Sequence, residues 1–103
     1  MSKILIVDDE TEILNPLEEM LKEEGFDVRA FTNPLKALDF LRTQSVDLAI
    51  FDIKMPELNG LDLLRYAREV HTNLPIIFLS SKNEDADQLV GFSIGADDYV
   101  GKP

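Results

Sequence analysis

The sequence predicts an α/β fold in which helices cover both faces of one parallel sheet. Short apolar runs of strand length alternate along the chain with segments whose apolar residues recur at helical spacing. Uninterrupted apolar runs are typical of strands that are buried on both faces, as in parallel sheets. Regular alternation of strand and helix favours right-handed crossovers between neighbouring parallel strands.

The length and composition indicate one compact domain. The chain has 103 residues, of which 45% are hydrophobic and 29% charged. Twenty acidic residues against ten basic ones give a formal charge of −10, which argues against direct binding to nucleic acid. The chain has no cysteine, so disulfides and thiolate metal sites are excluded. No stretch resembles a signal peptide or a membrane span, and we expect a cytoplasmic protein with no membrane partner.

Five strands are expected. Four correspond to the apolar runs at residues 4–7, 48–51, 75–79 and, more weakly, 99–100. Residues 26–31 alternate instead, with one apolar side, which is typical of a strand at the edge of a sheet.

The first predicted helix follows the first strand and ends at Gly25. Pro16 lies inside it and should kink the helix or shift its start, because proline removes a backbone hydrogen bond. The expected apolar stripe contains Ile13, Leu14, Leu17, Met20 and Leu21.

Three further helices are predicted along the chain. The second has Asn33 as its N-cap and Pro34 at its first position. Its inward face should contain Leu35, Leu38 and Leu41. The third begins near Asn59 and Gly60, where helical spacing outweighs a possible hairpin turn. The fourth covers roughly residues 84–94 and contains glycine, so its intrinsic stability is low.

Polar residues follow the strands at their carboxyl ends, where open parallel α/β sheets place their working groups. These residues are Asp8, Asp9, Asp52, Ser80, Ser81 and Lys102. Each alone is commonly a cap or a solvated side chain. Three carboxylates at neighbouring strand ends, however, repel one another unless a cation or a lysine neutralises them. Oxygen ligands without histidine or cysteine suit a hard ion such as Mg²⁺.

Asp52 follows the central strand of this row and is the candidate nucleophile. An aspartate can accept a phosphoryl group when the reacting atoms are in line and nearby positive charge stabilises the transition state. The sequence therefore predicts phosphoryl transfer to Asp52 beside a metal ion.

These motifs together resemble the receiver domain of two-component response regulators, along essentially the whole chain. The matching segments are ILIVDD at 4–9, DIKMPELNG at 52–60, LSS at 79–81 and GADDYVGKP at 95–103. The resemblance implies a flavodoxin-like, doubly wound sheet of five parallel strands in the order 2-1-3-4-5, within three α/β/α layers. It also implies a phosphorelay switch that catalyses its own phosphorylation and dephosphorylation, and not a turnover enzyme.

The resemblance assigns roles to individual residues. Asp52 would be the phosphorylation site, and it would share the metal with Asp9, with the Lys54 carbonyl and, partly through water, with Asp8. Lys102 would pair with the phosphoryl oxygens.

The remaining assignments concern the switch. Ser80 would move to hydrogen-bond the phosphoryl group, and Tyr99 would swing inward behind it. The family usually has threonine where Ser80 stands and alanine where Ser81 stands, so the switch position is expected to be held less firmly. Lys54 and Lys82 border the site in the family and are predicted to alter the lifetime of the phosphoryl group.

Residues 87–99 are similar to receivers of the OmpR/PhoB type, which carry a winged-helix DNA-binding domain. The receiver resemblance implies a sensor histidine kinase as partner. The OmpR/PhoB likeness implies a homodimer through the fourth helix and fifth strand, and contact with DNA only through an absent effector domain. Asp97 and Asp98 are candidate dimer contacts. Because the chain stops at Pro103, where the family continues into a fifth helix, we expect a receiver domain at 1–103 that is truncated before that helix and exposes apolar surface on one sheet face.

Three other interpretations remain open. A metal-dependent phosphohydrolase with an aspartyl nucleophile would need an acid/base aspartate where Lys54 stands. A nucleotide-binding domain would need a glycine-rich phosphate loop after the first strand, where Asp8 and Asp9 stand instead. An inert fragment would retain the motifs without a working switch. His71 is expected at the surface, with no role as relay or ligand.

Overall fold

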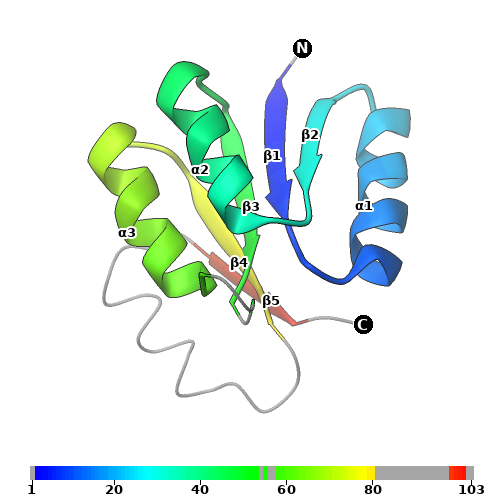
Figure 1. Cartoon of the computed structure of the whole chain (residues 1–103). Coiled ribbons are helices and arrows are strands. Elements are labelled where there is room, and N and C mark those ends of the chain that lie inside the picture. Colours follow the sequence, from blue (N-terminus) through cyan, green and yellow to red (C-terminus); the bar gives the residue numbers. More distant parts are fainter. Residues whose placement is uncertain (1, 54, 56–57, 81–97, 102–103) are drawn as a thin grey trace.

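The computed structural model describes residues 2–53, 55, 58–80 and 98–101 of the chain. Five strands of this part form one parallel sheet in the order β2-β1-β3-β4-β5 (Figure 1). Their bounds are Lys3–Val7 for β1, Asp27–Phe31 for β2, Leu48–Asp52 for β3, Ile76–Ser80 for β4 and Asp98–Gly101 for β5. The structure confirms the predicted fold class and strand order, including the position of β2 at one edge of the sheet.

Three helices connect the first four strands. They are α1 at Thr11–Glu23, α2 at Pro34–Thr43 and α3 at Gly60–Val70. Helix α1 is continuous through Pro16, and Gly25 follows its end with a φ of 96°. The predicted helix at 84–94 lies outside the described residues. None of the described helices combines the length and the apolar composition that crossing a membrane requires.

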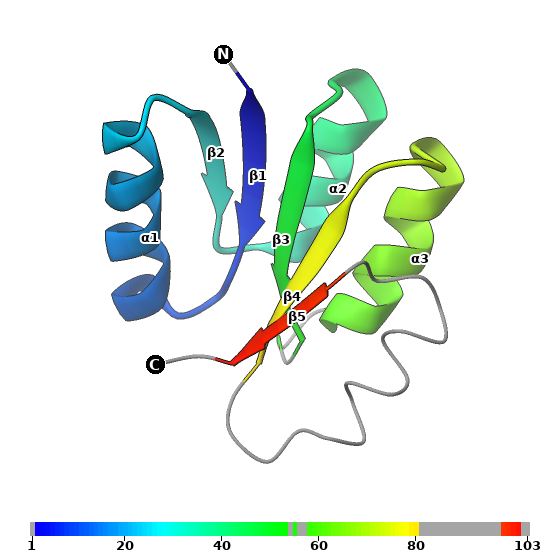
Figure 2. The same ribbon diagram turned by 180° about the vertical axis from the view of Figure 1, so that it is seen from behind.

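The helices lie on both faces of the sheet, with α2 and α3 on one face and α1 on the other (Figures 1 and 2). Alternate residues of each strand point to opposite faces, so both faces contribute to the core. The face under α2 and α3 contains Leu5, Val7, Ala49, Phe51, Ile76 and Phe78. The face under α1 contains Ile4, Ile6, Val28 and Ile50. This burial explains why the strands are apolar without interruption.

The two faces differ in how completely they are covered. Ile76 and Phe78 of β4 are 0% exposed beneath α2 and α3. Their neighbours Ile77 and Leu79 point to the α1 face and are only partly buried, as is Leu48 of β3. These three side chains are partly buried and not exposed, so the predicted exposure of apolar surface on this face stays a prediction.

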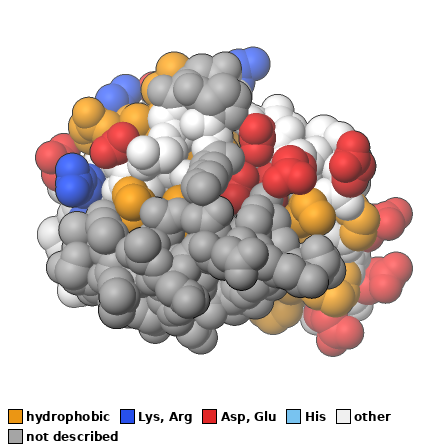
Figure 3. Space-filling model, turned by 90° about the horizontal axis from the view of Figure 1, so that it is seen from below, with side chains coloured by type: hydrophobic (Ala, Val, Ile, Leu, Met, Phe, Trp, Pro, Cys, Tyr) orange, Lys and Arg blue, Asp and Glu red, His pale blue; other side chains and the backbone are white. Residues whose placement is uncertain are grey.

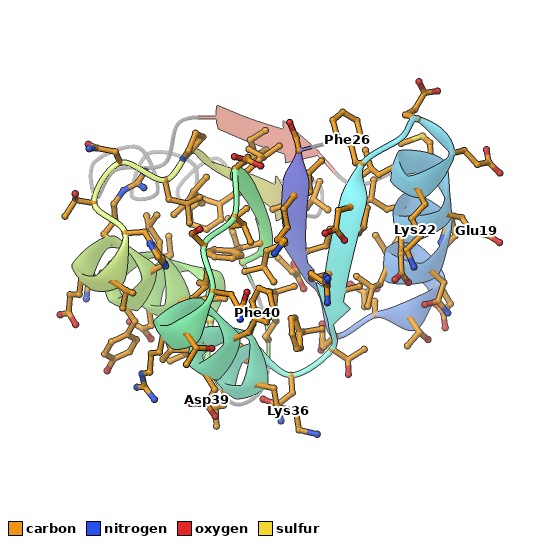
Figure 4. The ribbon with its side chains drawn as sticks, turned by 90° about the horizontal axis from the view of Figure 1, so that it is seen from above. Glu19, Lys22, Phe26, Lys36, Asp39 and Phe40 are labelled. Atoms are coloured by element: carbon orange, nitrogen blue, oxygen red, sulfur yellow. The ribbon has the colours of Figure 1, made fainter. Side chains whose placement is uncertain are left out.

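Most of the predicted helix faces are confirmed. The Asn33 side chain caps α2 by accepting from the Leu35 backbone N–H at 2.9 Å, as predicted. Figure 4 shows Phe40 pointing from α2 towards the sheet, where its ring lies 5.5 Å from that of Phe31. Two predictions were wrong, since Leu35 is 49% exposed and Met20 is 53% exposed. Helical spacing gives the direction of a side chain around its helix but not whether the sheet extends beneath it.

Candidate functional site

The carboxyl ends of β1, β3 and β4 meet at one place because neighbouring strands pair in register. Val7 of β1 pairs with Phe51 of β3, so Asp8, just beyond β1, lies level with Asp52 at the end of β3. Asp52 pairs in turn with Leu79 of β4. The sheet itself therefore sets the distance between the two aspartates.

Four carboxylates gather at this edge of the sheet. Oxygen atoms of Asp8, Asp9, Glu10 and Asp52 all lie within 4.8 Å of one another. Among the described side chains, Asp8 and Asp52 are the buried charged ones, at 0% and 3% exposure, whereas Asp9 and Glu10 are exposed. Figure 3 looks onto this edge and shows acidic side chains grouped there. The prediction that Asp8, Asp9 and Asp52 come together is confirmed.

This acidic cluster has an electrostatic cost. Two carboxylates about 5 Å apart repel each other by roughly 3 kcal/mol at an effective dielectric constant of about 20. The burial of Asp8 and Asp52 adds a desolvation cost of several kcal/mol per charge, which nearby positive charge must offset. The cluster is therefore an environment that favours a cation.

The donor atoms of the cluster suit a hard divalent cation. All four side chains offer carboxylate oxygens, and the chain has no cysteine to attract a softer metal. Mg²⁺ commonly binds through one or two carboxylates and completes its shell with water and phosphate oxygens. Two buried carboxylates with two exposed ones beside them match that pattern, because solvent reaches one side of the cluster. The residues present fit Mg²⁺.

Backbone hydrogen bonds hold the Asp8 end of the cluster. The Asp8 N–H donates to the Phe31 carbonyl at 3.1 Å, which extends the pairing of β1 with β2 by one residue. Asp8 Oδ1 accepts from the Glu10 N–H at 2.9 Å, so the chain turns sharply into α1. Glu10 occupies the N-cap position of α1 without a side-chain capping bond. Its carboxylate belongs to the acidic cluster instead.

The segment after Asp52 is held from three directions. The Ile53 N–H donates to the Leu79 carbonyl of β4 at 3.3 Å, and the Ile53 carbonyl accepts from the Gly60 N–H of α3 at 2.6 Å. The Met55 side chain is 8% exposed and packs in the core beneath α2 and α3. The backbone directly after Asp52 is therefore fixed to both β4 and α3.

The structure places the predicted switch residues only through their backbone. Ser80 is the last residue of β4 and pairs with Gly101, while Tyr99 in β5 pairs with Phe78. Asp98 is the first residue of β5. The predicted residues that lie outside the described part of the chain are Lys54, Ser81, Lys82, Asp97 and Lys102. The roles of all these residues stay predictions.

Sequence reasoning missed two features. Glu10 was not assigned to the site, although it is the third acidic residue in a row after β1, and that run was the available signal. His71 was expected at the surface, but its ring is half-buried and its Nε2 lies 2.7 Å from the Leu41 carbonyl near the end of α2. That contact joins the ends of α2 and α3, which no local pattern reveals.

Comparisons with known proteins agree with this geometry. The family model described as the response regulator receiver domain matches residues 4–103. The regulatory protein VanRc of Enterococcus gallinarum is 41% identical over 101 residues, which are 98% of this chain and 43% of that protein. The transcriptional regulatory protein CpxR of Escherichia coli is 42% identical over 103 residues, which are 100% of this chain and 44% of that protein. The chain thus spans less than half the length of these relatives, which are regulators of the OmpR/PhoB family.

Among solved structures, the response regulator protein TrrA of Thermotoga maritima, in complex with Mg²⁺ and BeF, has a TM-score of 0.88 and 35% identity. The match covers 100% of this chain and 88% of that one. This similarity covers all five strands of the sheet.

Proposed function

Because the chain belongs to the response regulator receiver domain family, we propose that Asp52 accepts a phosphoryl group from a sensor histidine kinase. The observation that carries this proposal is the position of Asp52, buried at the end of the central strand within a cluster of four carboxylates. Anchoring on both sides keeps its carboxylate in place for in-line attack. The chain is proposed to act as a signalling switch and not as a turnover enzyme.

The chemical step uses the Asp52 carboxylate as nucleophile. One of its oxygens attacks the phosphorus of a phosphohistidine, the phosphorus–nitrogen bond breaks, and the imidazole leaves with the electron pair and takes up a proton. Asp8, Asp9, Asp52 and the Lys54 carbonyl would hold Mg²⁺, with Glu10 beside them. When bound, Mg²⁺ supplies positive charge that stabilises the phosphoryl oxygens in the transition state.

Two further residues are proposed to stabilise the phosphorylated state. Lys102 would pair with the phosphoryl oxygens, and the Ser80 hydroxyl would donate a hydrogen bond to one of them. Hydrolysis by water would return Asp52 to a carboxylate, and the cations Lys54 and Lys82 would set how fast this happens. Self-catalysed phosphorylation and dephosphorylation are thus both assigned to this edge of the sheet.

The output is proposed to pass through β4 and β5. Ser80 ends β4, and Tyr99 lies in the neighbouring strand, so a displacement of Ser80 towards the phosphoryl group can reach the Tyr99 backbone through one strand pairing. Phosphorylation shifts the balance between two conformations only if the phosphoryl group interacts differently with each. The proposed differential contacts are those of Ser80 and Lys102.

The following proposals concern the whole protein, of which this chain is the receiver unit. We place it in the cytoplasm, with residues 1–103 as the receiver unit. An effector domain elsewhere in the whole protein would bind DNA, as the transcriptional regulator CpxR suggests by its name. A homodimer through the fourth helix and fifth strand would couple phosphorylation to that output.

Phosphorylation can be tested without the kinase. The chain is incubated with acetyl phosphate and Mg²⁺, and its intact mass is measured with and without a chelator. We expect a gain of one phosphoryl group that the chelator and the Asp52→Asn substitution both abolish. Asp39→Asn is the matched control, because Asp39 is exposed on the outer side of α2 (Figure 4). No gain in a folded sample would contradict the proposal.

A further inference from the structure

Gly60 is the first residue of α3 and lies against the end of the central strand. A Cβ atom at this position would meet the Asp52 carbonyl oxygen and would come within 2.8 Å of the Ile53 Cα. Both contacts are with backbone atoms, so no flexible side chain can move aside to relieve them. We propose that Gly60 is a positioning residue for Asp52, because only a hydrogen atom fits where the helix start meets this strand. This inference rests on the proposed role of Asp52 as phosphoacceptor.

Gly60 is required for space and not for conformational freedom. Among the described glycines, Gly25 is the one with a positive φ, and Gly60 adopts a conformation open to other residues. A Cβ at Gly25 would meet nothing within 4 Å. The two positions therefore separate the two physical reasons for glycine, which are backbone strain at Gly25 and close approach at Gly60.

Two hydrogen bonds hold the start of α3 close to the end of β3. The Gly60 N–H donates to the Ile53 carbonyl at 2.6 Å, which joins α3 to the residue next to Asp52. The Asn59 side chain accepts from the Asp62 N–H at 2.9 Å and fixes the first turn of α3. Ile53 is also bonded to β4, so a displaced helix start would transmit its movement to the strand end. The Asp52 carboxylate is attached to that strand end.

In Gly60→Ala, the start of α3 would move away from the end of β3. The movement is small, but it occurs directly beside Asp52. An ordinary van der Waals contact of a Cβ atom begins at 3.4 Å, so the contact with the Ile53 Cα alone requires a separation of about 0.6 Å, and the closer contact with the Asp52 carbonyl oxygen requires a larger one. Such a shift changes the distance between Asp52 and Asp8, which the strand register sets. Misplacement of a reacting group by about 1 Å can slow a reaction by roughly a hundredfold.

Gly60→Ala tests this inference, with Gly25→Ala as the matched control. Both substitutions should lower Tm, by about 4–8 °C for each kcal/mol that is lost. We expect only Gly60→Ala to weaken Mg²⁺ binding, measured by calorimetric titration, by about tenfold or more, and to slow phosphorylation by acetyl phosphate at saturating Mg²⁺. Gly25→Ala should keep both quantities within about twofold of the unmodified chain, because Gly25 lies after α1, away from the cluster. If both variants lose stability and neither changes Mg²⁺ affinity, Gly60 has only a structural role and the inference is wrong.

A second measurement needs no variant, in case Gly60→Ala does not fold. Amide hydrogen exchange of the unmodified chain is followed with and without Mg²⁺. We expect Mg²⁺ to slow exchange of the Gly60 N–H, because coupling between two sites is reciprocal. Unchanged exchange at saturating Mg²⁺ would overturn the inference.

The failure of the inference and of the proposed function can be told apart. If the unmodified chain gains no phosphoryl group, the proposed function fails. If it gains one and Gly60→Ala gains it at the same rate with the same Mg²⁺ affinity, only the inference about Gly60 fails.

Discussion

Asp8 and Asp52 lie on neighbouring strands at the same level of the sheet, and both are buried within one group of carboxylates whose oxygens are at most 4.8 Å apart. Like charges are rarely buried together, because repulsion and desolvation both oppose folding. The pairing of Val7 with Phe51 enforces this proximity. The repulsion between these two carboxylates and their desolvation therefore destabilise the metal-free fold. A bound cation would relieve both effects, and this relief would favour its binding.

Mg²⁺ should stabilise the chain against heat. A ligand that binds only the folded state at a hundred times its Kd adds about 2.7 kcal/mol to the free energy of unfolding. For a chain of this length, that gain raises Tm by about 10 °C or more. Differential scanning calorimetry with Mg²⁺ and with a chelator measures the difference. A Tm that does not respond to Mg²⁺ at millimolar concentration would count against the metal site.

Asp8→Asn should stabilise the metal-free chain. The substitution removes one buried charge from the cluster, while the asparagine Oδ1 can still accept from the Glu10 N–H. We expect the free energy of unfolding in a chelator to rise by about 1–3 kcal/mol, since the repulsion from Asp52 is relieved. Urea unfolding measures this change, and the exposed Asp39→Asn should stay within about 0.5 kcal/mol of the unmodified chain. A loss of stability in Asp8→Asn would show that repulsion does not dominate at this position.

Glu10→Gln should weaken Mg²⁺ binding without abolishing it. Its carboxylate belongs to the acidic cluster but is exposed, so water screens its charge more than those of Asp8 and Asp52. We expect affinity to fall by about two- to fivefold, measured by titration at low ionic strength. Glu23→Gln makes the same change at the exposed far end of α1 and should leave affinity unaltered. Equal effects of the two substitutions would mean that only net charge matters.

The two faces of β4 should differ in their contribution to stability. Phe78 is 0% exposed beneath α2 and α3, so Phe78→Ala should cost about 3–5 kcal/mol. Its neighbour Ile77 is partly buried on the α1 face, and Ile77→Ala should cost less than about 2 kcal/mol. Chemical unfolding of both variants gives the comparison. Similar losses would mean that the α1 face is as well packed as the other.

Much of the fold follows from the sequence because its signals are local. The apolar run at 48–51 predicts β3, and Asn33 followed by Pro34 predicts the start of α2, which the structure confirms at Pro34. The strands were predicted to within a residue or two of their observed ends. What failed was the assignment of Met20 and Leu35 to the core, because periodicity gives a direction around a helix but not how far the sheet extends beneath it.

The site was less predictable than the fold. The convergence of Asp8, Asp9 and Asp52 followed from the rule that parallel strands end at one edge, and the structure confirms it. Glu10 belongs to the acidic cluster because of a turn that the Asp8 side chain stabilises. The contact of His71 with the Leu41 carbonyl joins residues that are 30 positions apart in the sequence. Both depend on tertiary geometry, which no local pattern encodes. The close approach of Gly60 to the Asp52 carbonyl is of the same kind.

The position of the phosphoryl group on the chain decides whether Asp52 is the phosphoacceptor. After reaction with acetyl phosphate and Mg²⁺, reduction with borohydride converts an aspartyl phosphate into homoserine, and peptide mass spectrometry then identifies the modified residue. We expect homoserine at position 52 and unmodified aspartate at positions 8 and 9. Homoserine at another aspartate, with Asp52 intact, would contradict the assignment of Asp52 as the phosphoacceptor.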